Sequence, residues 1–310
     1  TMPAHTPDPQ VHVASNGRFT TVVSNAGGGF SYWYDADTRQ TVDLTRWRAD
    51  ATRDAHGVWL YIQDITPPQG EGRPSKNGRQ ELAGETNSRA WSAGRQPLPG
   101  AGEGGEMECF AHMAILRRKA HDIASALDVT VAPDDDVEIR QLWLTNHTDR
   151  PRRLRVTSYG EVILTPQASD ARHPAFNKLF IESEYVAAAN ALVLRRRPRS
   201  KAEADRPLYL VHAVVPPAGA AATGAYETDR ARFFDRYAAS DALPRALRDD
   251  ARSRARHASG PLCTLDPIFS LTQEITLKPR ETVRVAFLTL VAPSRAEALS
   301  LVRRYRNWHI

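Results

Sequence analysis

The stretch that decides the fold is 136-DVEIRQLWLTN-146, which 147-HTDRP-151 separates from 152-RRLRVTSYGEVIL-164. Both long runs are rich in β-branched and aromatic residues, and the segment between them carries turn residues. Apolar side chains in the first run alternate with polar neighbours, with Trp143 breaking the strict order: Val137, Ile139, Leu142 and Leu144. We therefore predict two strands joined as the strongest β-hairpin of the chain.

Short β-rich runs separated by turn residues continue in both directions from this stretch. Residues 11–15 and 18–25 flank Asn16-Gly17, a dipeptide typical of a type I′ hairpin with positive φ at both centres. Three glycines precede an aromatic strand in 26-AGGGFSYWYD-35, which predicts a bulged, tight turn. Further runs lie at 57–65, 191–197, 208–215, 269–277 and 281–291, the last after a turn at Pro279-Arg280. The absence of strand–helix alternation predicts an all-β fold, a large antiparallel sandwich.

Helical signals are few. The clearest is 293-PSRAEALSLVRRYR-306, where Ser294 and Glu297 form a capping box. Four of its residues share one face at helical spacing: Ala298, Leu301, Val302 and Tyr305. A turn or two of helix is also predicted within 228–237, whereas segment 67–106 is rich in Pro and Gly and is predicted to be a long loop.

Composition excludes several classes of protein. No apolar run in the 310 residues reaches the length that a membrane helix requires. Arg is interleaved with Asp and Glu rather than clustered, which argues against a nucleic-acid partner. Cys109 and Cys263 are isolated, so we expect buried thiols and a reducing compartment, and the spacing of the ten histidines predicts no metal site. We expect no cofactor, and a disordered tail over residues 1–9.

Nine stretches occur in an order that resembles a known family: 15–35, 43–64, 90–97, 136–148, 157–164, 170–180, 195–200, 227–236 and 265–271. They include 170-DARHPAFNKLF-180 and 195-RRRPRS-200. Together they look like the N-terminal β-sandwich of the glycoside-hydrolase family 94 phosphorylases, in the version carried by cyclic β-1,2-glucan synthases. The resemblance covers residues 11 to about 295.

This resemblance implies a galactose-mutarotase-like supersandwich over residues 10–292, with residues 293–310 as the start of a helical linker to an (α/α)6 barrel. In the family the barrel carries the general acid and the phosphate site, so we expect a non-catalytic domain. The implied partners are that barrel, a β-glucan oligosaccharide bound weakly by the domain alone, and a homodimer. The implied location is cytoplasmic, on the cytosolic side of a bacterial inner membrane.

Candidate cleft-facing residues follow from the motifs. Tyr32 and Trp33 offer flat faces to a sugar, although strand alternation directs one of them to the core. Trp91 stands isolated in the predicted long loop. Arg46 and Trp47 lie among Arg48, Asp50, Arg53 and Asp54, which either fix a loop or hold a ligand.

Asp170, His173 and Phe176 follow the end of a predicted strand, where the chain must leave the sheet. Pro174 favours an extended conformation at His173. These side chains either fix the loop by hydrogen bonds or face the glucan and the barrel, with Phe176 as a stacking surface. The most concentrated positive charge could meet phosphate, an acidic surface of the barrel, or solvent: Arg195, Arg196, Arg197 and Arg199.

Two alternatives stay open. A free-standing enzyme of the mutarotase or epimerase type would pair His173 or His212 with Glu161 as acid and base, converging in one open pocket. A purely structural module would dock onto its barrel and touch no sugar. Removal of a barrel that covers one face should leave an exposed apolar or Arg-rich patch.

Overall fold

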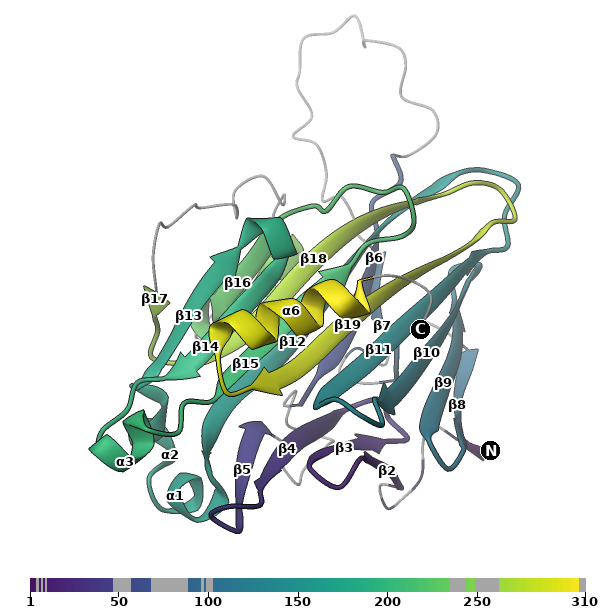
Figure 1. Cartoon of the computed structure of the whole chain (residues 1–310). Coiled ribbons are helices and arrows are strands. Elements are labelled where there is room, and N and C mark those ends of the chain that lie inside the picture. The colour runs from purple at the N-terminus through teal and green to yellow at the C-terminus, as the bar shows by residue number, and fades with distance from the viewer. Residues whose placement is uncertain are drawn as a thin grey trace, which may run out of the picture.

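Two large antiparallel sheets packed face to face make up the domain (Figure 1). The computed structural model describes residues 1–3, 6, 8, 10–46, 57–67, 89–95, 98, 103–234, 243–248 and 262–306. The two-sheet sandwich predicted from the sequence is confirmed. None of the helices in these ranges is both long enough and apolar enough to cross a membrane.

Within the described ranges the first sheet has ten strands. Their order is β1 (Met2–Pro3), β8 (Glu103–Cys109), β9 (Met113–Ala120), β10 (Ile123–Val131), β11 (Val137–Asn146), β19 (Thr282–Ala292), β15 (Tyr209–Val215), β14 (Ala191–Arg196), β13 (Ile181–Val186) and β17 (Leu262–Cys263). Because β1 pairs with β8, the prediction of a disordered tail is wrong at Met2 and Pro3.

The second sheet has nine strands in the same described part of the chain. Seven follow in the order β16 (Ala225–Asp229), β18 (Pro267–Leu277), β12 (Arg152–Pro166), β5 (Gln40–Thr45), β4 (Gly29–Asp35), β3 (Phe19–Ser24) and β2 (Val11–Ser15), while β6 (Trp59–Asp64) pairs with β12 and β7 (Arg89–Ser92) with β6. β7 and part of β8 lie within 67–106, so the prediction of an unbroken loop is wrong there, and residues 68–88 lie outside the described residues.

Helices are short apart from the last one. They are α1 (Gln167–Arg172), α2 (Pro174–Lys178), η1 (Ala187–Ala189), α3 (Lys201–Ala204), α4 (Arg230–Phe234), α5 (Arg245–Arg248) and α6 (Arg295–Tyr305). Ser294 caps α6 by accepting a hydrogen bond from the Glu297 amide, as predicted. The buried face of α6 packs on β15 and β19, covering the outer side of the first sheet (Figure 1). Whether α6 begins a linker stays a prediction.

The hairpin predicted over 136–164 is wrong. β11 pairs with β10 and β19 in the first sheet, whereas β12 pairs with β18, β5 and β6 in the second. Residues 147–151 therefore carry the chain from one sheet to the other. The side-chain amide of Asn146 fixes this crossing by donating to the carbonyls of Arg150 and Lys278.

The first hairpin is confirmed, but its turn differs from type I′. Ser15 pairs with Thr20, and of the two central residues only Gly17 takes a positive φ, at 91°. The Asn16 side chain closes the turn instead, because its oxygen accepts from the amides of Arg18 and Phe19.

The core between the sheets also contains charged groups. Leu142 and Leu144 point inward together with Glu138 and Arg140, while Val137 and Ile139 face α6 on the other side of β11. Arg140 and Glu138 pair at 2.6 Å, and the Ser31 hydroxyl of the opposite sheet donates to Glu138 at 2.6 Å. This buried network ties the two sheets together. Cys109 and Cys263 are free and exposed, so the prediction of buried thiols is wrong.

Candidate functional site

The chain leaves the second sheet at a distortion near the end of β12. The register with β5 shifts between Val162 and Thr165, and Leu164 adopts a left-handed φ of 49°. Such a conformation is unfavourable for a branched side chain and is typical of sites where surrounding contacts impose it. The distortion directs the chain into α1 and α2, where the sequence predicted a loop.

These two helices form a corner in which several predicted residues meet, and we call it the α1–α2 corner (Figure 1). His173 separates the helices with φ −143° and ψ 65°. Its φ is that of the extended conformation expected before Pro174, but its ψ lies below the extended range, and its side chain is exposed. The corner is defined by Arg46, Asp170, His173, Phe176, Asn177, Phe180, Arg196 and Arg199.

A buried ion-pair network anchors this corner to the sheet. Arg46, at the end of β5, makes two contacts of 2.9 Å with the carboxylate of Asp170. Its Nε lies 3.4 Å from Glu161, which also pairs with Arg230 at 3.0 Å. The loop-fixing role predicted for Arg46 and Asp170 thus has a geometric basis, whereas Trp47, Arg48, Asp50, Arg53 and Asp54 lie outside the described residues.

The network brings a third carboxylate close to Asp170. Burial, reinforced by the negative charge of Asp170, raises the pKa of Asp43 to about 6, although Arg46 acts in the opposite direction. Asp43 therefore changes charge in a pH range where most carboxylates are already ionised. The sequence alone gave no indication of Asp43, because its proximity to Asp170 depends on pairing between β5 and β12.

Arginines from the strand end contact aromatic rings of α2 and the residues that follow it. The Arg199 guanidinium lies 4.9 Å from the ring centre of Phe176 and 5.1 Å from that of Phe180. Arg196 lies 5.2 Å from the Phe180 ring and donates at 3.1 Å to both the carbonyl and the side-chain oxygen of Asn177. Two motifs that were separate in the sequence therefore form one cluster.

The other two predicted arginines differ from these. Arg197 lies 5.7 Å from the Phe180 ring, at the edge of the cluster. Arg195 points to the opposite side of β14 and pairs with Glu182 at 2.8 Å. Of the predicted cationic group, Arg196 and Arg199 therefore belong to the corner, Arg197 lies at its edge, and Arg195 lies outside it.

Exposed apolar side chains surround a pocket of about 500 Å³ at this corner. Phe176, Leu179 and Leu265 are 46%, 44% and 72% exposed and line it together with Arg46 and Lys178. Large apolar side chains rarely gather on a solvent-exposed surface without a partner. Leu179 and Leu265 were not predicted, although both belong to quoted motifs.

The predicted acid–base pairs do not form an open site. His212 is completely buried between the sheets, where it bonds Ser158 at 2.8 Å and Thr289 at 3.1 Å. Burial, with a smaller effect of Arg140, lowers the pKa of His212 to about 3, so the ring is neutral. Glu161 is buried in its ion pairs while His173 is exposed, and the linings of the three main pockets in the described part of the chain contain neither of these histidines nor Glu161.

The aromatic candidates are placed differently from one another. Trp33 packs against the core and donates its Nε1 hydrogen to Asp136 at 2.9 Å, while Tyr32 on the opposite face of β4 contacts Phe30. The prediction that one of these two points inward is confirmed. Trp91 is fully buried against His121, so the expectation that it faces a cleft is wrong.

The two packed antiparallel sheets place the chain in the class of large β-sandwich domains. Residues 2–69 and 82–308 match the family described as glycosyl hydrolase 94, supersandwich domain. The chain therefore belongs to this family, and the resemblance read from the sequence is confirmed.

Two relatives share sequence with the chain. It is 27% identical over 300 residues to the cyclic beta-(1,2)-glucan synthase NdvB of Rhizobium meliloti (strain 1021), covering 97% of the chain and 9% of that protein. It is 20% identical over 181 residues to an N,N′-diacetylchitobiose phosphorylase of Vibrio furnissii, covering 58% of the chain and 20% of that protein. The chain thus spans only a small part of the relatives that it matches.

Two solved structures align with most of the chain at low sequence identity. A bacterial glucoamylase complexed with acarbose aligns with 99% of the chain and 37% of its own length, at a TM-score of 0.49 and 8% identity. A protein of Escherichia coli K12 assigned as an aldose 1-epimerase aligns with 92% of the chain and 100% of its own length, at a TM-score of 0.46 and 9% identity.

Proposed function

We propose that this chain is a non-catalytic assembly and carbohydrate-contact domain of a glycoside phosphorylase module of the cyclic β-1,2-glucan synthase type. The observation that carries the proposal is the exposed group of Phe176, Leu179 and Leu265 beside the arginines of the α1–α2 corner. A surface of this kind fits an (α/α)6 catalytic barrel with an apolar and acidic contact face. The chain covers 9% of NdvB, which is consistent with a role as one domain of a larger protein.

The buried network beneath the corner supports this role. Arg46, Asp170 and Glu161 are held by one another, so they position α1 and α2 rather than present reactive groups. A rigid base of this kind lets exposed side chains meet a partner with little loss of conformational entropy. In the assembled protein His173 and Phe176 would then border the glucan cleft.

The test compares the isolated domain with the whole protein. The 310-residue chain should show no phosphorolysis and no mutarotation of glucose. In the whole protein Phe176→Asp should lower glucan synthesis or phosphorolysis by roughly tenfold or more, whereas Tyr34→Asp, at another exposed aromatic residue, should leave it unchanged. Turnover by the isolated chain, or full activity of Phe176→Asp, would contradict the proposal.

Partner and location follow from the same proposal. Titration of the whole protein and of the isolated domain with linear β-1,2-glucans separates a sugar-contacting domain from a docking module that touches no sugar. We also propose the cytosolic side of a bacterial inner membrane, which the two exposed, free cysteines support. Light scattering of the purified chain tests the predicted homodimer.

A further inference from the structure

A second pocket lies beside α6 and is lined by residues of both sheets. We call this cavity the α6 pocket; its volume is about 730 Å³, and it shares no lining residue with the pocket of the α1–α2 corner. Its walls come from β4, the segment before β15, the end of β19 and one side of α6. A volume of this size is in the range of pockets that enclose small organic ligands.

The apolar part of the α6 pocket contains an aromatic side chain held in one orientation. Trp33 lines the pocket with Leu208 and Leu301. Its indole Nε1 donates to Asp136, whose other carboxylate oxygen accepts from Arg18 at 3.0 Å. Because both oxygens of Asp136 are engaged, the indole ring is fixed before any ligand arrives.

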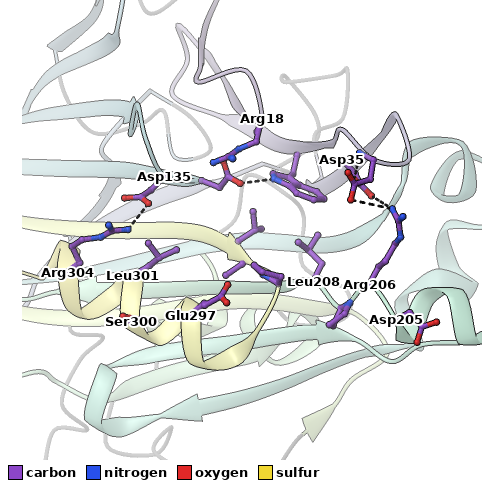
Figure 2. Close-up of a pocket in the computed structure, with 17 residues that line it drawn as sticks. Arg18, Asp35, Asp135, Asp205, Arg206, Leu208, Glu297, Ser300, Leu301 and Arg304 are labelled. Atoms are coloured by element: carbon purple, nitrogen blue, oxygen red, sulfur yellow. Dashed lines mark hydrogen bonds and ion pairs between the residues drawn. The ribbon is translucent and has the colours of Figure 1, made fainter.

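Charged groups surround this apolar part on two sides. Figure 2 shows Asp35 with Arg206 at one side and Asp135 with Arg304 at the other, with Leu208, Leu301 and Glu297 between the two pairs. The distances are 3.6 Å for Arg206–Asp35 and 2.6 Å for Arg304–Asp135. Both arginines are more than half exposed, so they can donate further hydrogen bonds to a ligand.

The net charge of the residues that line the α6 pocket limits which kinds of ligand it can bind. The described lining contains six carboxylates and three guanidinium groups, a formal charge of −3. Burial opposes ionisation of Asp35, but hydrogen bonds from the Thr38 side chain and from backbone amides hold its pKa below the ordinary value. A phosphorylated or carboxylated ligand would be repelled, and a purely apolar one would leave the polar rim without partners.

From these observations we propose that the α6 pocket is a binding site for a neutral saccharide of one or two sugar units. A pyranose has one apolar C–H face that fits the flat indole of Trp33 and a ring of hydroxyl groups that both donate and accept. The carboxylates accept from those hydroxyls, and the guanidinium groups donate to them. The site is independent of the docking proposed above, since it is complete within the described part of this chain.

The experiment is an NMR titration of the 310-residue chain with sophorose, cellobiose and glucose 1-phosphate. The two neutral disaccharides should shift the signals of Trp33, Leu208 and Leu301 with a Kd on the order of 1 mM, whereas glucose 1-phosphate should not. Trp33→Ala should weaken binding by roughly tenfold or more. Tyr32→Ala is the matched control, because Tyr32 lies next in the strand on the opposite face, and it should bind as the parent does.

A second pair of variants keeps the test informative if Trp33→Ala does not fold. Ser300 is exposed at the pocket on α6, so Ser300→Trp should obstruct the pocket and abolish binding, while Ser300→Ala should not. Absence of shifts at the pocket with 50 mM of either disaccharide (roughly fifty times the expected Kd) would overturn the proposal. Equal binding of glucose 1-phosphate would overturn it as well. Phe176→Asp should leave this titration unchanged, so failure here is distinguishable from failure of the docking proposal.

Discussion

The α1–α2 corner and the α6 pocket differ in where their charges lie. At the corner the central guanidinium of Arg46 is 11% exposed and its carboxylate partners are buried with it, while apolar side chains face the solvent. In the α6 pocket the guanidinium of Arg304 is 60% exposed, and the apolar groups lie beneath the charged rim. Buried ion pairs of the first kind position backbone elements, whereas exposed ones of the second kind remain able to bond a ligand.

The largest expected effect of a substitution is at the buried pair. Arg46→Ala leaves Asp170 and Glu161 without their shared cation, and we expect a loss of about 3 kcal/mol in the free energy of unfolding at pH 7. Urea denaturation followed by circular dichroism measures the loss. Arg46→Lys keeps the positive charge but not the two-pronged contact with Asp170. Its free energy of unfolding should therefore lie between those of the parent protein and Arg46→Ala. A loss under about 1 kcal/mol for Arg46→Ala would mean that the corner is not anchored by this network.

A smaller effect of opposite sign is expected at Asp43. Its folded pKa of about 6 exceeds the unfolded value near 4, so the folded protein loses stability as pH rises through this window and carries the full penalty above it. Asp43→Asn removes the penalty. Because Asp43 is only half-buried, we expect a gain of about 1 kcal/mol at pH 7.5 and none at pH 4. Thermal unfolding at both pH values tests this, and an equal gain at pH 4 would contradict it.

At the rim of the corner, Arg199→Ala removes a cation that contacts Phe176 and Phe180. A partly exposed cation–π contact contributes roughly 0.5–1 kcal/mol, so the melting temperature should fall slightly. Arg195→Ala on the other side of the strand lacks these ring contacts and removes an ion pair with Glu182 instead, so it gives the loss expected for a surface ion pair alone. An unchanged melting temperature for Arg199→Ala would show that the aromatic contacts contribute nothing.

The smallest effect is expected in the α6 pocket. Arg304→Ala should cost less than about 0.5 kcal/mol, because the pair is exposed and Asp135 keeps its hydrogen bond from the Tyr305 hydroxyl at 2.7 Å. The same substitution should weaken saccharide binding measurably. A large loss of stability with unchanged saccharide binding would show that this ion pair supports the fold, as the pair at the corner does, and does not contact the ligand.

The strands and their approximate limits were predictable because alternation and turn residues act locally. Partners were not, as β11 and β12 show. The two strands are adjacent in sequence, yet β11 pairs with β10 and the distant β19 in one sheet, while β12 pairs with β18, β5 and β6 in the other. The inward orientation of Glu138 and Arg140 was missed for a related reason. Charged residues in a strand are expected to face the solvent. Their burial here depends on hydrogen bonds from a distant strand, such as the one that Ser31 donates to Glu138.

The candidate sites show the same limit. His173 and Phe176 could be singled out because their motif is compact, and the Arg196 contact with Asn177 then joins it to a second motif. The α6 pocket could not be predicted, since Trp33, Arg206 and Glu297 come from three distant segments. Trp91 is a residue that the sequence singled out wrongly. It stands isolated in a Pro- and Gly-rich segment, yet its side chain is fully buried in the core.

One wall of the α6 pocket is a single helix of eleven residues, held to the sheet by Ala298, Leu299 and Val302. A molecule that occupies the pocket would contact this helix and the sheet at once. Ligand binding and the attachment of α6 to the sheet are therefore thermodynamically coupled. Any force that detaches α6 from the sheet therefore empties the pocket, and any occupant resists that force.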